Sequence, residues 1–139
     1  MYQDKKCVII GASHGGVNCA FALRKEGYQG EIILIDADPS LPYHRPPLSK
    51  TFLTEAAEIE KYRMKPWTSY EKSNITLLLG KKVVSLDAAQ QILGLEEGEQ
   101  ITYDHLVFAT GASAFYPPIE GLKTTPNLFV LRSAADVAG

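Results

Sequence analysis

A glycine-rich segment at residues 11–16 (GASHGG) holds the residue types and spacing that could do chemistry. It stands between a short apolar run and a helix-like pattern, and an acid, Asp36, follows 20 residues after Gly16. A helix that begins at such a turn directs free N–H groups and a partial positive charge toward phosphates. A carboxylate after the second strand can accept hydrogen bonds from a ribose. The spacing therefore predicts a dinucleotide held through its pyrophosphate.

Each position of this turn has a physical requirement. Gly11 allows a tight bend, and Gly16 lets the helix pack closely on the strand. Ser13 stands where the pattern has a second glycine, so its Cβ and hydroxyl take space where a phosphate should approach the backbone.

The same turn fits a rival pattern, the G-x-S-x-G nucleophile elbow of α/β hydrolases, with Ser13 as nucleophile. That fold needs an oxyanion-hole N–H from an earlier loop, and only a few residues precede the first apolar run. A triad would also need an acid and a histidine from downstream. His44 lies among prolines and His105 precedes an apolar run, so surface or packing roles are expected for both.

The elements that must position the turn form a strand–helix–strand unit. Apolar runs at 7–10 and 32–35 indicate strands buried on both faces, as in a parallel sheet, and 15–26 has a helical pattern. A third such strand is predicted at 106–109.

The intervening residues predict smaller elements. Residues 39–47 hold four prolines and form a loop, followed by a short helix near Leu48 and a helix at 66–74. A strand is expected at 75–79, and strands of a meander at 83–86, 91–95 and 100–103. The predicted class is α/β: a Rossmann-like, mostly parallel sheet with flanking helices and a small antiparallel meander.

Composition excludes several classes of function. The 139 residues carry 14 basic and 16 acidic side chains, without a basic stretch for nucleic acid. No run approaches the ~20 apolar residues of a membrane span, and the first residues do not resemble a signal peptide, so a cytoplasmic location is expected. Cys7 and Cys19 are expected to be buried thiols, and no metal site is predicted.

Three further segments carry a family resemblance. Residues 42–50 (PYHRPPLSK), 109–111 (ATG) and 131–136 (LRSAAD) follow the glycine turn in order. With that turn, they resemble the FAD-dependent ferredoxin reductases that serve oxygenases, within the pyridine nucleotide-disulphide oxidoreductase superfamily. The proline loop is the most specific of these segments, whereas A-T-G is shared by many flavin and NAD enzymes.

The resemblance implies roles for individual residues. Lys50 would lie near the flavin N5, where a cation stabilises negative charge on the reduced ring. Val83 would meet adenine through its backbone, and Arg132 would reach FAD. Arg45 would either shape the loop or touch FAD. The glycine turn and the resemblance together give as candidate cofactor contacts Gly11, Ala12, Ser13, Gly15, Gly16, Asp36, Asp38, Arg45, Lys50, Val83, Ala109, Thr110, Gly111 and Arg132.

Two features of the candidate site depart from the family. The family's ribose acid aligns within residues 36–38, where the middle residue is Ala37, so Asp36 and Asp38 both remain candidates. The arginine that often follows A-T-G is absent from residues 112–115 (ASAF).

The resemblance also implies an activity. It is transfer of electrons from NAD(P)H through FAD to an iron–sulfur protein of the ferredoxin or rubredoxin type. The proline loop contains no cysteine, so electrons would pass directly from flavin to an external acceptor.

The chain is much shorter than these reductases. We expect residues 1–139 to be the N-terminal segment of an FAD-binding domain, with a nucleotide-binding core at 1–115 and a connection at 116–139 toward an NAD-binding domain. Such a fragment should lack turnover by itself. A non-catalytic dinucleotide-binding module is the alternative that titration of FAD, ADP and NAD would distinguish.

Overall fold

A computed structural model describes residues 4–55 and 58–138. The chain divides into two compact units: Met1–Tyr43 with Arg63–Thr110, and His44–Tyr62 with Gly111–Gly139. The first unit contains β1 (Lys6–Ile10), α1 (His14–Lys25), β2 (Glu31–Asp36), α3 (Trp67–Lys72), β3 (Ile75–Leu79), β4 (Val83–Asp87), β5 (Ile92–Leu95), β6 (Gln100–Thr102) and β7 (His105–Phe108). The second contains the 3₁₀ helices η1 (Pro46–Ser49), η2 (Ile59–Tyr62) and η3 (Leu122–Thr124), and the helices α2 (Thr51–Glu55) and α4 (Ala134–Ala138).

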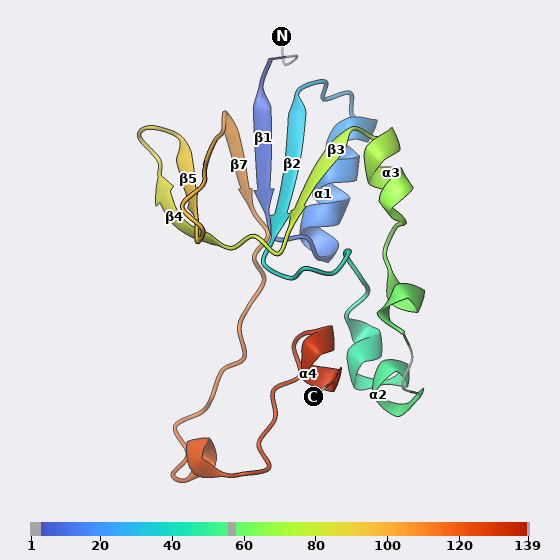
Figure 1. Ribbon diagram of the computed structural model, residues 1–139, viewed down its shortest axis with the longest axis vertical. Helices are drawn as coiled ribbons and strands as arrows, with labels where there is room; N and C mark the ends of the chain where they lie inside the picture. Colours follow the sequence, from blue (N-terminus) through green and yellow to red (C-terminus); the bar gives the residue numbers. More distant parts are fainter. Residues whose placement is uncertain (1–3, 56–57, 139) are drawn as a thin grey trace. The chain divides into compact units, whose positions relative to one another are not determined.

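A four-stranded parallel sheet in the order β3-β2-β1-β7 forms the centre of the first unit (Figure 1). Val8 of β1 pairs in register with Ile33 of β2 and with Leu106 of β7. Because the strands are parallel, their carboxyl ends meet at one edge of the sheet. The glycine turn, the acid at the end of β2 and the A-T-G segment after β7 therefore lie at the same edge.

Two different layers cover the two faces of this sheet, which explains the continuous apolar runs of β1 and β2. On one face, α1 and α3 bury side chains such as Ile9 and Leu34 together with Val17 and Tyr70. On the other face, Val8 and Ile35 pack against Leu93 of the antiparallel sheet β4-β5-β6. A strand with apolar side chains on both faces loses water from both, so alternation is absent.

The predicted architecture is confirmed: a parallel sheet with flanking helices and a small antiparallel meander. The strand at 75–79 has the predicted bounds, and the other predicted strands and α1 differ by one residue at one or both ends. Pro66 is the N-cap of α3 instead of its first helical residue, and the helix ends before Asn74, which has a left-handed φ of 51°.

One burial prediction was wrong. The strand at the A-T-G end is half-buried, and Phe108 is 62% exposed. Its sequence is as apolar as that of β1, but β7 lies at an edge of the sheet and pairs only with β1 in the described residues. An edge strand is covered less completely than a central one, and strand order cannot be read from a local apolar run.

The second unit consists of short helices and extended chain. It contains helices at two of the three segments that carry the family resemblance beyond the turn: η1 lies in the proline loop, and α4 begins within the L-R segment. Leu48 of η1 is its buried residue. Within the described residues, no helix is long and apolar enough to cross a membrane.

Candidate dinucleotide-binding site

The glycine turn bends where β1 passes into α1. Gly11 has a φ of +105°, a conformation that side chains disfavour, and a Cβ there would overlap the carbonyl of Ala109. A Cβ on Gly16 would overlap the carbonyl of Gly11 and would lie 3.3 Å from Cδ1 of Leu34 on β2. Both glycines are therefore required by close backbone approaches, as the sequence pattern predicts.

Ser13 fits this turn because its backbone does not need glycine. It is the N-cap of α1 with φ −105° and ψ −158°, an extended conformation open to any residue. The alternative hydrolase hypothesis needs a histidine next to Ser13, and the sheet does not supply one. His105 is level with Cys7 in the β1–β7 register, at the amino end of the strands, whereas Ser13 lies beyond their carboxyl ends. His44 is exposed in the proline loop of the other unit.

A cavity of about 200 Å³ opens at the carboxyl edge of the sheet, next to the turn. Predicted contact residues from four separate segments line it, namely Gly11, Asp36, Val83 and Thr110. The remaining lining residues are Ile10, Ile35, Ala37, Lys81 and Lys82. The sheet thus brings the turn, the acid and the start of β4 to one place.

The two candidate ribose acids have different surroundings. Oδ2 of Asp36 accepts a hydrogen bond of 2.5 Å from the Ala12 N–H, and Oδ1 accepts one of 2.8 Å from the Asp38 N–H. These bonds fix the carboxylate at the cavity wall. The Asp38 carboxylate is bound instead by the Ser40 N–H and by the Tyr43 hydroxyl, each at 2.9 Å, and it does not line the cavity.

These features fit a dinucleotide. The absence of side chains at Gly11 and Gly16 leaves the backbone of the turn close to the A-T-G segment, and Gly15, which is exposed, would place a Cβ 3.7 Å from that of Ala109. The first N–H groups of α1 have no partners earlier in the helix and can donate to a pyrophosphate. A carboxylate held by two amides still has lone pairs for ribose hydroxyls.

Arg45, Gly111 and Arg132 lie together in the second unit. Nη1 of Arg45 donates to the carbonyl of Arg132 at 2.7 Å, and Nη2 of Arg132 lies 2.6 Å from where a Cβ on Gly111 would be. Gly111 has a φ of +68°. The proline loop, the A-T-G end and the L-R segment therefore meet around one pair of arginines.

Asp136 orders the L-R segment, a role the sequence did not reveal. Its Oδ2 accepts hydrogen bonds from the backbone N–H groups of Ser133 (2.6 Å) and Arg132 (2.9 Å) and from the Ser133 hydroxyl (2.9 Å). These bonds, led by that of the Ser133 amide, hold the pKa of Asp136 below its usual value. The sequence contained a signal for this role, since a serine followed three residues later by an acid resembles the capping box, in which the acidic side chain reaches back to a backbone N–H at the start of a helix.

Lys50 is exposed at the end of η1, where its N–H donates to the carbonyl of Pro47 at 2.9 Å. It belongs to the second unit, and its predicted position by the flavin stays a prediction.

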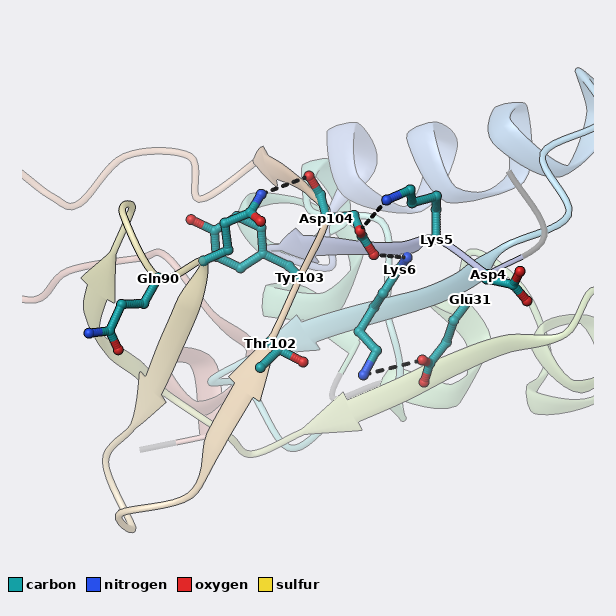
Figure 2. Close-up of a pocket in the computed structure, with 9 residues that line it drawn as sticks. Asp4, Lys5, Lys6, Glu31, Gln90, Thr102, Tyr103 and Asp104 are labelled. Carbon is teal, nitrogen blue, oxygen red and sulfur yellow. Dashed lines mark hydrogen bonds and ion pairs between the residues drawn. The ribbon is translucent and has the colours of Figure 1, made fainter. Parts of the chain in front are cut away.

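A larger hollow, of about 450 Å³, lies at the opposite, amino end of the strands (Figure 2). Four of its charged groups are bound in pairs: Lys5 pairs with Asp104 at 2.8 Å, and Lys6 with Glu31 at 3.3 Å. It contains no residue of the glycine turn or of the family segments. Within the described residues, no group of three or more His, Cys, Asp or Glu side chains could hold a metal ion.

The sheet order and the glycine turn define a Rossmann-like dinucleotide-binding fold. The model of the pyridine nucleotide-disulphide oxidoreductases matches residues 5–138, and the chain belongs to this family. Its members bind FAD and use NAD(P)H as substrate, which confirms the predicted family and cofactor.

Individual relatives are reductases of small electron carriers. The chain is 40% identical over 129 residues to rubredoxin-NAD(+) reductase of Pseudomonas putida, covering 93% of this chain and 33% of that protein. It is 45% identical over 106 residues to the ferredoxin–NAD(+) reductase component of the p-cumate 2,3-dioxygenase system of Pseudomonas putida, covering 76% and 26%. A covalent putidaredoxin reductase–putidaredoxin complex superposes with a TM-score of 0.83 at 34% identity, covering 96% and 33%. The chain thus spans about a third of the first relative's length.

Proposed function

We propose that this chain is the FAD-binding part of an NAD(P)H-dependent reductase that passes electrons to a ferredoxin- or rubredoxin-type protein. The observation that supports this most directly is the cavity beside the glycine turn, where Gly11, Asp36, Val83 and Thr110 converge from separate segments. Membership of the family supports FAD as the cofactor, and the likeness to rubredoxin and ferredoxin reductases supports the class of electron acceptor.

In this proposal the first unit holds the adenosine diphosphate half of FAD. Gly11, Ala12, Gly15 and Gly16 form the turn that holds the pyrophosphate, which also receives the partial positive charge of α1. Gly15 and Gly16 donate their N–H groups to it, whereas the N–H groups of Gly11 and Ala12 are bound to the Ile35 carbonyl and the Asp36 carboxylate and so fix the bend. Ser13 borders the same phosphates with its hydroxyl as an added donor. The remaining contacts in this unit come from Asp36 to the ribose, from the Val83 backbone to adenine, and from Ala109 and Thr110 beside the turn.

Asp36 is the preferred ribose acid because its carboxylate lines the cavity. Asp38 acts indirectly, since its carboxylate holds the Tyr43 hydroxyl and the Ser40 amide and so orders the chain that leads into the proline loop.

The second unit supplies cations for the rest of the cofactor. Arg132 reaches FAD beside Gly111, and Arg45 shapes the segment through its bond to the Arg132 carbonyl. Lys50 lies near the flavin and stabilises negative charge on the reduced ring. When bound, FAD would accept hydride and release single electrons. The residues of this chain would bind it, orient it and set the charge around it.

Purified chain titrated separately with FAD, ADP and NAD tests the proposal. Binding of FAD and ADP without preference for NAD supports it, and a flavin absorption band in the purified protein would do so directly. A preference for NAD would contradict it in favour of a different dinucleotide-binding module. We expect no turnover with NADH, FAD and an electron acceptor, because the chain spans about a third of the first relative's length.

We place the activity in the cytoplasm, where NAD(P)H is regenerated. Both cysteines are free thiols, Cys7 buried and Cys19 half-buried, as is usual for a reducing compartment.

A further inference from the structure

The start of β4 is tied to the cavity by its backbone. The Lys81 N–H donates to the carbonyl of Asp36 at 2.9 Å, and the Gly80 N–H donates to that of Asp38 at 3.2 Å. Lys81, Lys82 and Val83 then line the cavity. These two bonds therefore attach the chain just before Val83, the residue proposed to meet adenine, to the end of β2 and the residues that follow it.

Ion pairs of the Lys81 side chain attach the start of β4 to a second part of the chain. The Lys81 ammonium forms ion pairs with Glu97 and, at 3.2 Å, with Glu99, both in the turn that joins β5 and β6. The hydrogen bonds with Glu97 and then Glu99 raise the pKa of Lys81, so the lysine stays charged. We call Lys81, Glu97 and Glu99 the turn clamp.

The turn itself is well ordered for this purpose. The Leu95 N–H donates to the Glu99 carbonyl at 2.8 Å, the Gly98 N–H to the Leu95 carbonyl at 2.9 Å, and the Glu96 N–H to the Lys82 carbonyl at 2.9 Å. Two glutamates on one lysine that is 29% exposed form a stronger connection than an isolated exposed pair. Its ammonium is thereby directed to the turn.

We propose that Lys81 is a positioning residue for the adenosine half of the cofactor, acting through the turn clamp and without contacting the ligand. The inference rests on the proposed function of the cavity. Because Lys81 lines the cavity with its backbone anchored and its ammonium bound to the turn, it sets the path of the chain into Val83. Loss of the clamp lets this segment move, and the free energy of ordering it must then come from ligand binding.

The direction in which two variants change the affinity for ADP distinguishes a positioning role of Lys81 from direct binding of phosphate by its ammonium. In the positioning role, Lys81→Met and the double variant E97Q/E99Q both weaken ADP binding, by about fivefold each, since either breaks the clamp. If the ammonium contacted phosphate, E97Q/E99Q would release it toward the ligand and tighten ADP binding. Lys81→Arg, which keeps the charge, should restore affinity to within about twofold.

Lys6→Met is the matched control. Lys6 is 31% exposed and pairs with Glu31 at 3.3 Å at the amino end of the same sheet. Both lysine variants should lower the unfolding midpoint slightly, but only Lys81→Met should change the dissociation constant of ADP, measured by calorimetry.

The outcomes separate the two claims. A wild-type chain that binds neither ADP nor FAD overturns the proposed function and this inference with it. A wild-type chain that binds ADP, with an unchanged dissociation constant in Lys81→Met or tighter binding in E97Q/E99Q, overturns the positioning role alone.

Discussion

The amide of Ala12 in the glycine turn donates a 2.5 Å hydrogen bond to Oδ2 of Asp36 at the end of β2. The bond joins the segment proposed to bind pyrophosphate to the acid proposed to bind ribose. It fixes that carboxylate at the cavity wall, whereas Asp38 is held by Tyr43 and Ser40.

Asp36→Asn should weaken ADP binding about tenfold, because a hydrogen bond to a charged acceptor contributes about 1.5 kcal/mol or more. Asp38→Asn should leave the affinity within about twofold and lower the unfolding midpoint, since its carboxylate orders a loop. Titration calorimetry measures both. The loss in Asp36→Asn should disappear with 2′,3′-dideoxyadenosine diphosphate, which lacks the ribose hydroxyls. An equal loss with that ligand would mean that Asp36 acts only on the turn.

The glycines of the turn should differ sharply in their tolerance of alanine. Gly11→Ala and Gly16→Ala should each destabilise the fold by about 3 kcal/mol or more, because the new Cβ overlaps a backbone carbonyl in both. Gly15→Ala is the control. Its Cβ would make an ordinary 3.7 Å contact with Ala109, and alanine favours a helix by about 0.8 kcal/mol. Urea unfolding followed by circular dichroism gives the order; equal losses at all three positions would contradict this account of the turn.

The parts of the fold that could be predicted are those with a local signal. The apolar runs of β1 and β2, the glycine turn between them and the acid at Asp36 lie within one short stretch, and their pattern can be recognised without knowing the distant residues that they contact. The resemblance then added the segments at 42–50, 109–111 and 131–136. Their residues lie in both units. For those in the second unit, such as Lys50, the proposed contact with FAD rests on the family resemblance alone.

Interactions between distant residues could not be predicted. Arg24 looks like a solvent-facing helix residue, yet its guanidinium donates to the carbonyls of Tyr28, Gly30, Ser73 and Asn74 at 2.7–2.9 Å. It thereby fastens the end of α1 to the start of β3, 50 residues away. No local pattern distinguishes this arginine from an exposed one. The turn clamp around Lys81 escaped prediction for the same reason.

The pair formed by Lys5 and Asp104 at the amino end of the sheet should make stability depend on pH (Figure 2). The hydrogen bond from the Lys5 ammonium, followed by that from the Lys6 N–H, lowers the pKa of Asp104 from its ordinary 3.8. A carboxyl whose pKa is lower in the folded state stabilises the fold above the unfolded pKa. This contribution is lost as pH falls from about 3.8 through the lowered value.

Asp104→Asn should therefore unfold at lower urea than the wild type near neutral pH, with the difference shrinking below about pH 4. Lys5→Met should reduce the same difference at neutral pH, because it removes the main partner of Asp104. A difference that stayed constant from neutral pH to pH 2 would show that the carboxylate charge contributes nothing.

Tyr70 on α3 carries a buried hydroxyl without a hydrogen-bond partner among the described residues. The side chain is 1% exposed, burial raises its pKa to about 12, and its ring packs edge-on against Phe21 at 5.3 Å. A buried polar group without a partner costs about 1–3 kcal/mol of desolvation. Tyr70→Phe keeps the ring contact and removes that cost, so it should stabilise the fold by about 1 kcal/mol.

Tyr43→Phe is the matched comparison for Tyr70→Phe, because the Tyr43 hydroxyl, on an equally buried ring, donates to Asp38 at 2.9 Å. That variant should lose about 1.5 kcal/mol of stability or more, the usual contribution of a hydrogen bond to a charged acceptor. Both substitutions remove a phenolic hydroxyl from a buried ring. Changes of opposite sign in the free energy of unfolding, measured with urea, would therefore link the effect to whether that hydroxyl has a hydrogen-bond partner. A loss of stability in Tyr70→Phe would instead mean that a bound water satisfies the Tyr70 hydroxyl inside the core.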